Sequence, residues 1–433
     1  MIIQDLSKRA DGSFTISNIS LNPQFFETEN ILLSNFLSSL NDPQCSSNPP
    51  PTLKENQLTL STLIKEYLDH KSNEGTWRKK TKLENEAPLN LLLEITGDVV
   101  VSTIDHATAN YFRDTIIKLP TNRNKKPEFR NLTISEIVNL SLPKEQLLSN
   151  SNINKLLSRV VACFNYALQR GYATNNYFKG HTLKNSKSAR EQRERFSKED
   201  LSKLFSHQIF CNDKAYDPFK YWLPLLGLLT GGRLNELSQL HISDIYRTCD
   251  IWVISIDDET DDKKLKNNTS RRIIPIHSKL IELGFLKHVN QRKELVKTGS
   301  CTCPRLWPQL TLARISQCYG KKPSYWFNQT LKKETLGIET KNQCFHSLRH
   351  SVATKLINAL VPEERVAAIT GHSLGNGELL NRYVKGIDVK QLKKDIELLN
   401  FDEELVNVSP FEGKHGLEKN KNANTNAIGK NDE

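Results

Sequence analysis

The sequence predicts a mainly α-helical protein with one small β-sheet or hairpin, in which a helical unit precedes a larger mixed α/β unit. Three observations support this fold class. Apolar residues recur at three- and four-residue spacing from Leu58 to about Gly180, which is typical of packed helices. The apolar run that begins at Phe219 is interrupted by two glycines, which predicts a buried helix followed by a second helix. The runs IWVISI at 251–256 and RRIIPI at 271–276 predict a hairpin with a long tip.

Charge narrows the class of partner. Lys and Arg total 60 and Asp and Glu total 49, and the resulting formal charge of +11 favours a polyanion such as nucleic acid or an anionic membrane surface. The chain has no run of about 18 apolar residues, and its first residues lack the pattern of a signal peptide. We therefore expect a soluble intracellular protein of the cytoplasm without a membrane partner.

The eight cysteines are scattered without the spacing of a disulfide framework, which predicts free thiols. Cys301 and Cys303 lack a second pair of Cys or His at zinc-finger spacing, and this disfavours a structural zinc site. The motifs described below also lack a carboxylate cluster suited to two metal ions. We expect neither a metal nor a cofactor.

Changes in composition divide the chain into five segments. Residues 41–56 contain three successive prolines and read as a linker, and the role of the residues before them stays open. The insert TNRNKKPEFRN, residues 121–131, is cationic and is equally typical of a phosphate-tracking segment and of a solvated loop. The expected segments are an N-terminal segment with its linker, a helical domain, a basic linker, a mixed α/β domain and a largely disordered tail, at residues 1–56, 57–182, 183–199, 200–400 and 401–433.

The stretch CFHSLRHSVATKL places titratable and cationic side chains on a helix that is otherwise apolar. The spacing puts His346 and Arg349 on one face and the leucines and valine, Leu348, Val352 and Leu356, on another. Taken alone, this pattern is more typical of an amphipathic helix whose basic face meets solvent. The alternative is a pair of side chains that grip a phosphate.

The stretch TGGRLNEL makes the second interpretation stronger. Arg233 follows a glycine break beside an apolar helix, where a guanidinium is costly unless it binds an anion. That anion is either Glu236, one turn further on, or an external phosphate. Together with Arg349, Arg233 would form a two-pronged clamp.

A third stretch, ITGHSLGNGELLNRYVKG at 369–386, follows a helix that begins near Pro362. We expect that helix to end at Gly371 and to leave His372 at its C-terminal edge. Tyr383 follows a short helix later, and by itself it is more typical of a packing or surface tyrosine.

The motifs TGGRxNEL, HSLRH, TGH and RYV, in this order, resemble the tyrosine recombinase family, the phage-type integrases. The resemblance spans roughly residues 200–390, and residues 58–180 resemble the family's core-binding domain with a longer insert. It implies a helical core-DNA-binding domain joined to a mixed α/β catalytic domain.

The resemblance also implies a role for each motif residue. Tyr383 would be the nucleophile, and Arg233 and Arg349 would hold the nonbridging oxygens of the scissile phosphate. His346 would accept a proton as general base, and His372 would hydrogen-bond the phosphate. His372 and Tyr383 stand eleven positions apart, slightly more than is usual in the family.

The family's lysine lies on the β-hairpin a few residues before an R-x-x-P strand. Lys266 matches that position best, and Lys264 and Lys263 are the alternatives. A lysine on a mobile hairpin can protonate the leaving 5′ oxygen. His350 is not the family's catalytic histidine and is interpreted as a core or supporting group.

The resemblance implies a site-specific recombinase that cuts and rejoins double-stranded DNA through a 3′-phosphotyrosine, for integration or excision of a prophage or integrative element. We expect a homotetramer on two DNA sites, helped by accessory DNA-bending or excision factors. The two domains should close around the duplex from opposite sides, with affinity that falls steeply as salt rises. The alternatives are a type IB-like topoisomerase and a catalytically inactive DNA-binding regulator of the same fold.

Overall fold

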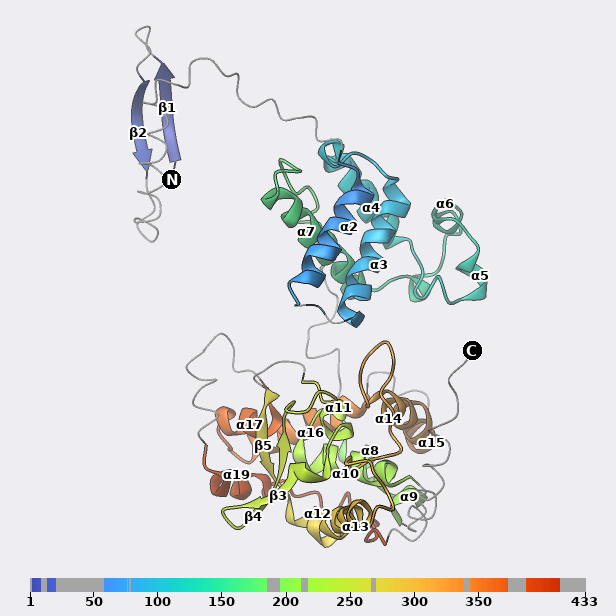
Figure 1. Ribbon diagram of the computed structural model, residues 1–433. Coiled ribbons are helices and arrows are strands. Elements are labelled where there is room, and N and C mark those ends of the chain that lie inside the picture. The colour runs from blue at the N-terminus through green and yellow to red at the C-terminus, as the bar shows by residue number, and fades with distance from the viewer. Residues whose placement is uncertain are drawn as a thin grey trace. The chain divides into compact units, whose positions relative to one another are not determined.

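A computed structural model describes ten stretches of the chain, shown in colour in Figure 1. Side chains are described in all of these except the first two. The chain divides into two compact units, with residues 89–143 and 157–181 in the first and residues 182–412 in the second. The described stretches are 2–8, 14–20, 58–75, 77, 79–184, 195–211, 217–265, 270–337, 343–372 and 387–412.

An antiparallel hairpin lies at the N-terminus, in the segment whose role the sequence leaves open. Its strands are β1 (Ile2–Lys8) and β2 (Phe14–Ser20), and Ile2 pairs with Ser20 at the open end. The sequence signal for a turn is the pair Asp11–Gly12 between two short runs that contain Ile, Leu and Phe.

The helical prediction for the region after Leu58 is confirmed. On the first helix, Leu60, Leu63, Ile64 and Tyr67 are all buried, and their spacing forms one apolar stripe. The elements are α2 (Leu60–Asn73), α3 (Lys79–Thr96), η3 (Val101–Thr103), α4 (His106–Ile117), α5 (Pro127–Arg130), α6 (Ile134–Val138), η4 (Lys144–Gln146) and α7 (Asn150–Gln169).

The cationic insert at 121–131 includes the short helix α5. Phe129 is buried, Lys126 lies over its ring at 5.3 Å, and Arg123 forms an ion pair with Glu94 of α3. The insert is therefore partly packed on the helical unit, which the interpretation as a simple solvated loop does not account for.

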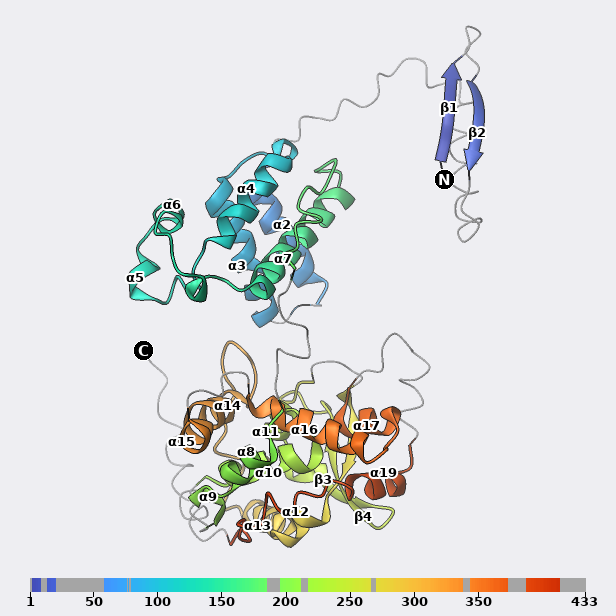
Figure 2. The same ribbon diagram turned by 180° about the vertical axis from the view of Figure 1, so that it is seen from behind.

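The second unit is built around α10 (Pro218–Thr230), which is buried from end to end, as its apolar sequence predicts. It contacts α16 (Phe345–Asn358) along its length, and the two helices lie side by side in both views of the molecule (Figures 1 and 2). The other elements are α8 (Lys198–Phe205), α9 (Gln208–Cys211), α11 (Leu234–Ser238), η5 (Ile242–Asp244), α12 (Ser278–Glu282), α13 (Phe285–Lys297), α14 (Lys321–Tyr325), the π-helix η7 (Trp326–Leu331), α15 (Lys332–Leu336), α17 (Glu363–Thr370) and α19 (Val389–Ile396).

A three-stranded antiparallel sheet covers one side of this unit, in the order β3 (Ile245–Thr248), β4 (Ile251–Ile256), β5 (Arg272–Pro275). The predicted hairpin corresponds to β4 and β5. The sequence analysis missed β3 because it is short and only its first residue, Ile245, is buried. Helices α17 and α19 pack against β5 (Figures 1 and 2).

The packed unit extends beyond the predicted limits of 200–400 at both ends. Phe196 is buried in the core, and Ser197 caps α8 through its side chain. At the other end the core takes in Phe401 and Phe411. The expectation of a largely disordered tail from residue 401 therefore fails for residues 401–411, because their apolar side chains have a core to enter; residues 413–433 lie outside the described part.

Helix α19 and the residues after it pack on their own unit. Ile396 and Leu399 are fully buried, the ammonium of Lys393 donates to the carbonyl oxygen of Ile276 at 2.7 Å, and Ser278 donates its backbone N–H to Glu397 at 3.0 Å. The segment is thus part of the fold that supports β5.

Replacing Ile396 with alanine is expected to lower the free energy of unfolding by about 2–5 kcal/mol, because it removes buried methyl groups and leaves a cavity. Urea denaturation of the full chain measures this change. The matched control is Leu398→Ala, whose side chain is 47% exposed and should change the stability little. Equal stability of the two variants would contradict the observed packing of α19.

The described cysteines are free thiols, as the sequence predicts. Cys301 Sγ lies 3.5 Å from the Nη2 atom of the buried Arg292. None of the described helices has the length and the apolar character of a membrane-spanning segment.

Candidate functional site

The ends of two helices create the site, and a left-handed glycine terminates each of them. Gly231 ends α10 with a φ of 65°, and Gly371 ends α17 with a φ of 75°. The sequence analysis predicted the end of α17 at Gly371, and this is confirmed. Both glycines turn the chain so that carbonyl oxygens of the last turn remain available to donors.

Arg349 lies between these two helix ends and is 1% exposed. Its Nη1 atom donates to the carbonyl oxygen of Gly231 at 2.8 Å and to that of Thr370. Its buried Nη2 atom has no hydrogen-bond partner among the residues that the structure describes. Burial, together with the nearby charges of Arg233 and Arg272, lowers the pKa of Arg349 to about 9. The interpretation of this helix face as a solvated basic surface is therefore wrong for Arg349.

Arg233 lies just before α11, and both its backbone N–H and its side chain donate to the buried carboxylate of Glu236. Its N–H donates to Glu236 Oε2 at 3.0 Å, and its Nη1 atom donates to Glu236 Oε1 at 2.7 Å and to the hydroxyl of Ser270 at 3.2 Å. Its Nη2 atom donates to the carbonyl oxygen of Gly371 at 2.9 Å. The Arg233 side chain is 24% exposed, so it is held by these bonds and is still accessible to solvent.

Arg272 is a third arginine of the site, and the sequence analysis missed it. Its Nη2 atom donates to Glu236 at 2.8 Å, and its Nη1 atom donates to the carbonyl oxygen of Ser270 at 2.9 Å. The available signal is its place on β5, where it is in phase with the buried Ile274. A charged residue on the buried face of a strand indicates a paired, positioned group.

Three consecutive carbonyl oxygens at the end of α17 each accept from a different arginine. Arg272 Nε donates to Ile369 at 2.9 Å, and Thr370 and Gly371 accept from Arg349 and Arg233 as described above. The C-terminal end of a helix carries partial negative charge and suits cations. With three guanidiniums and one carboxylate, Glu236, the site retains two positive charges.

His372 bonds to Arg349 in this structure. Thr370 Oγ1 donates to the carbonyl oxygen of Val366 at 2.6 Å, so it accepts from His372 Nδ1, 3.0 Å away. The other ring nitrogen, Nε2, then accepts from Arg349 Nε at 3.2 Å. Burial and the neighbouring cations lower the pKa of His372 to about 3, so the ring is neutral. The predicted donor to phosphate is here an acceptor that orients Arg349.

His346 lies one turn before Arg349 on α16, in the position that the sequence predicts. Its ring meets that of His350 edge-on, with the centroids 4.9 Å apart. Both rings are close enough to His372 to contribute to the lowering of its pKa. His372 thus bonds directly to Arg349, and His346 lies one turn from Arg349 on the same helix.

The predicted hairpin lysine is only partly located. Lys266 lies outside the described residues. The ammonium of Lys263 is buried and donates to Asp244 at 2.6 Å and to Asp257 at 2.9 Å, so it is committed to a structural ion cluster. Lys264 is half-buried, and its backbone N–H is bonded. Lys266 and Lys264 thus stay as the candidates for the hairpin lysine. Tyr383, the predicted nucleophile, lies outside the described residues, as Lys266 does.

Glu236 gives the site a characteristic dependence on pH. Burial alone would raise its pKa, but Arg272 and Arg233 outweigh that influence and hold the pKa at about 2, against 4.5 for an ordinary glutamate. A lowered carboxyl pKa contributes stability that is present above pH 4.5 and is lost as the pH falls toward 2.

A Glu236→Gln variant is therefore expected to have a lower free energy of unfolding than the wild type at neutral pH. The difference should narrow as the pH falls from 4.5 toward 2, because in that interval the Glu236 carboxyl becomes protonated in the unfolded wild type but stays charged in the folded protein. Chemical denaturation at a series of pH values measures the difference. A difference that stays constant with pH would contradict the arrangement of Glu236 between two guanidiniums.

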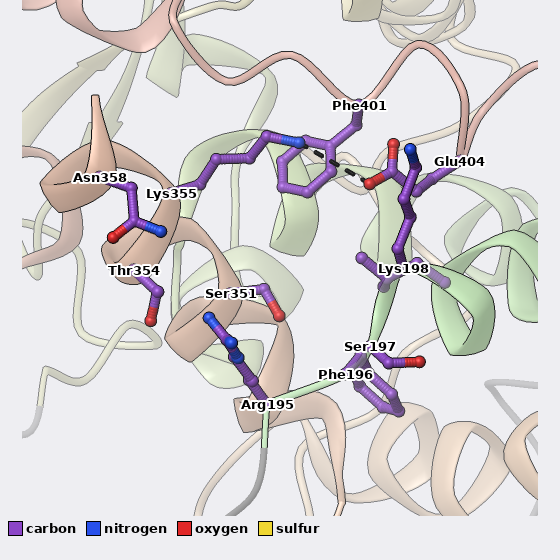
Figure 3. Close-up of a pocket in the computed structure, with 11 residues that line it drawn as sticks. Arg195, Phe196, Ser197, Lys198, Ser351, Thr354, Lys355, Asn358, Phe401 and Glu404 are labelled. Atoms are coloured by element: carbon purple, nitrogen blue, oxygen red, sulfur yellow. Dashed lines mark ion pairs between the residues drawn. The ribbon is translucent and has the colours of Figure 1, made fainter.

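A separate pocket of ≈ 440 Å³ lies along the C-terminal half of α16 (Figure 3). Two of its cations are already paired, Lys198 with Glu403 and Lys355 with Glu404. None of the predicted site residues lines it. Its lining consists of Arg195, Phe196, Ser197, Lys198, Leu201, Ser351, Thr354, Lys355, Asn358, Phe401 and Glu404.

Comparison with known proteins shows which family and which relatives the chain resembles. Residues 194–387 match the sequence model of the phage integrase family. A tyrosine recombinase XerC-like protein of Caldanaerobacter subterraneus subsp. tengcongensis is 27% identical over 300 residues, which cover 64% of this chain and 74% of the relative.

Two solved structures are similar in fold. Residues 82–397 of the Tn1549 transposon integrase, in complex with circular intermediate DNA, match with a TM-score of 0.51 and 18% identity, over 78% of this chain and 98% of that one. A lambda integrase tetramer bound to a Holliday junction matches with a TM-score of 0.50 and 16% identity, over 86% and 96%. The family match over residues 194–387 and the XerC-like relative support an assignment of this segment to the tyrosine recombinases.

Proposed function

We propose that this chain is a site-specific recombinase that cuts and rejoins DNA through a 3′-phosphotyrosine intermediate, and that it integrates or excises a prophage or integrative element. Tyr383 is the nucleophile in this proposal, and Arg233 and Arg349 hold the two nonbridging oxygens of the scissile phosphate. His346 accepts the phenol proton, and the hairpin lysine, Lys266, protonates the leaving oxygen.

The observation that carries the proposal is the arrangement of arginines at the end of α17. The carbonyl oxygens of Thr370 and Gly371, neighbours in the chain, hold Arg349 and Arg233 next to each other. Arg349 has a buried Nη2 atom that the described residues leave without a partner, and a buried donor of this kind is costly unless a ligand satisfies it. A phosphodiester supplies the required acceptor oxygens.

The excess charge of the site suits the transition state better than the ground state. A phosphodiester carries one negative charge, and attack by an incoming oxygen increases the charge on the nonbridging oxygens. Two net positive charges, fixed before the substrate binds, stabilise that increase without reorganisation.

Proton transfers complete the reaction. A tyrosine with a pKa near 10 is protonated at neutral pH, so the attack of the Tyr383 oxygen on phosphorus requires a base. His346 is proposed for this task. The bond from phosphorus to the 5′ oxygen breaks, the lysine protonates that oxygen, and a 5′-hydroxyl leaves. The phosphotyrosine linkage conserves the energy of the broken phosphodiester bond, so rejoining needs no nucleotide cofactor.

Both predicted domains, residues 57–182 and 200–400, are proposed to bind duplex DNA, with four protomers acting on two DNA sites and with accessory DNA-bending or excision factors. Support comes from the net charge of +11 and from the similar structures, of which one is in complex with circular intermediate DNA and the other is a tetramer bound to a Holliday junction. Affinity should fall steeply with salt, since basic side chains release counterions.

The proposal is tested with DNA fragments that carry the element's two end sequences under different labels. The expected result is exchange of labelled strands, together with a covalent protein–DNA adduct on a nicked substrate that prevents rejoining. Peptide mapping of the adduct should identify the segment that contains Tyr383. Relaxation of supercoiled DNA without exchange would instead indicate a topoisomerase, and absence of any adduct would indicate an inactive regulator.

A further inference from the structure

We propose that the side chains of Asn235 and Gln239, called here the α11 bracket, are positioning residues that hold the hairpin loop so that its lysine reaches the leaving 5′ oxygen. This inference rests on the proposed function. Asn235 belongs to the motif TGGRxNEL and Gln239 lies just after it, and the sequence analysis gave neither residue a role. The contacts of α11 and of the hairpin loop suggest the role.

Gln239 holds the loop directly. Its side chain is buried, and its Oε1 atom accepts from the backbone N–H of Lys264 at 3.0 Å. Lys264 is itself a candidate for the hairpin lysine, and Lys266 follows two residues later. The bond therefore fixes the backbone of the loop immediately before the proposed proton donor.

Asn235 holds Gln239 in place and ties it to a second loop. Its Nδ2 atom donates to the same Gln239 Oε1 atom at 3.1 Å. Its Oδ1 atom accepts from the backbone N–H groups of Tyr319 and Gly320, at 2.9 and 3.1 Å. A single half-buried amide thus orients Gln239, and the loop that precedes α14 holds that amide in place.

The hairpin loop is anchored on both sides of its undescribed residues. Before them, Leu265 is buried in the core and Lys263 is fixed by its two carboxylates. After them, the hydroxyl of Ser270 accepts from Arg233. The loop is thus bonded to the α11 segment twice, through Gln239 at the C-terminal end of α11 and through Arg233 at the N-terminal end.

This geometry links the two halves of the chemistry. Arg233 is proposed to bind the nonbridging oxygens, and the lysine is proposed to protonate the bridging oxygen of the same phosphate. A segment of seven residues, 233–239, carries the first group and is bonded to the backbone at Lys264, two residues before Lys266. General acid catalysis depends on hydrogen-bond reach, and displacement by about 1 Å can cost about 100-fold in rate.

The chemical step provides a selective readout. In ordinary DNA, the oxygen of Tyr383 bonds to phosphorus, the bond to the 5′ oxygen breaks, and that oxygen takes a proton from the lysine. When sulfur replaces the bridging 5′ oxygen, the leaving group is a thiolate, which departs without a proton because thiols are far more acidic than alcohols. A defect in the general acid therefore disappears with the sulfur substrate, while a defect in folding or DNA binding persists.

The experiment measures single-turnover cleavage of both substrates by the full-length protein. Gln239→Met, which keeps the side-chain length but removes the acceptor, is expected to cleave ordinary DNA at least about tenfold more slowly and the sulfur substrate at nearly the wild-type rate. Gln239→Glu retains an accepting oxygen and should recover much of the rate on ordinary DNA. Gln291→Met on α13 is the matched control and should resemble the wild type on both substrates.

Hydrogen exchange gives a second readout that does not depend on activity. The amide of Lys264 should exchange faster in Gln239→Met than in the wild type, and binding of the DNA site should be unchanged. Equal slowing of Gln239→Met on both substrates, or a wild-type rate on ordinary DNA, would overturn the positioning role.

Lys266→Ala separates this inference from the proposed function. If Lys266→Ala is restored by the sulfur substrate and Gln239→Met is not, the α11 bracket has no part in proton transfer while the proposed function stands. A different result would be that the sulfur substrate restores neither Lys266→Ala nor Lys264→Ala, so that each variant is as slow on it as on ordinary DNA. The general-acid step of the proposed function would then fail, and the inference would fail with it.

Discussion

An Arg349→Ala variant should cleave DNA at least about 100-fold more slowly than the wild type, because removal of a preorganised donor to a developing oxyanion typically costs that much. The side chain lies between two helix ends, with its Nη2 atom left for a ligand and its other nitrogens bonded to Gly231, Thr370 and His372. DNA binding should be largely retained, since many other basic groups contribute to it. Single-turnover cleavage and DNA binding are measured side by side.

Two further variants make this result specific. Arg349→Lys keeps a positive charge but has one nitrogen in place of three, so it cannot bond both carbonyl oxygens and His372 and still reach a phosphate. Its cleavage rate should fall nearly as far as that of the alanine variant. Arg247→Ala, at an exposed position of β3, should leave the rate unchanged. Cleavage by Arg349→Lys at nearly the wild-type rate would contradict the role proposed for the Arg349 Nη2 atom.

A Tyr383→Phe variant should lose strand cleavage and the covalent adduct completely. The change removes the one oxygen that is proposed to attack phosphorus, and it leaves the arginines and the DNA-binding surface intact. Adduct formation on a nicked substrate, followed by denaturing electrophoresis, measures the loss. The control is Tyr325→Phe, whose side chain is 70% exposed, and it should form the adduct normally. An adduct that persists in Tyr383→Phe would assign the attack to another residue.

Sequence patterns predicted the parts of the site that depend on local structure. The glycine after α17, the helix that carries His346 and Arg349, and the break before Arg233 all follow from spacing and from glycine. Pairing of Arg233 with Glu236 also follows, because the two residues are one turn apart. These features need no knowledge of distant contacts.

The parts that the sequence analysis missed depend on contacts between distant segments. Arg272 joins the site only because β5 lies against the end of α17, and Gln239 meets Lys264 across 25 positions of sequence. The orientation of His372 toward Arg349 depends on the hydroxyl of Thr370, which no spacing rule includes. Tertiary packing determines these three features.

The extent of the packed unit was misjudged for a similar reason. The residues after 400 have few apolar side chains, and a charge-rich sequence of this kind is typical of a tail. Phe401, Leu405 and Phe411 nevertheless enter the core. A few well-spaced apolar residues are sufficient when an adjacent core has room for them.

The central claim is that Arg233 and Arg349 act on the two nonbridging oxygens of one phosphate. A methylphosphonate at the scissile position tests it directly, because one nonbridging oxygen and its charge are replaced by a neutral methyl group. Arg233→Ala and Arg349→Ala are compared with the wild type on ordinary DNA and on the two methylphosphonate stereoisomers.

Both variants should recover activity relative to the wild type when the scissile phosphate is neutralised, each with the opposite stereoisomer, by at least about tenfold. One contradicting result would be that a variant recovers activity only when a phosphate other than the scissile one is neutralised. Another would be that neither variant recovers activity at any position. Either result would show that the two guanidiniums do not share a phosphate.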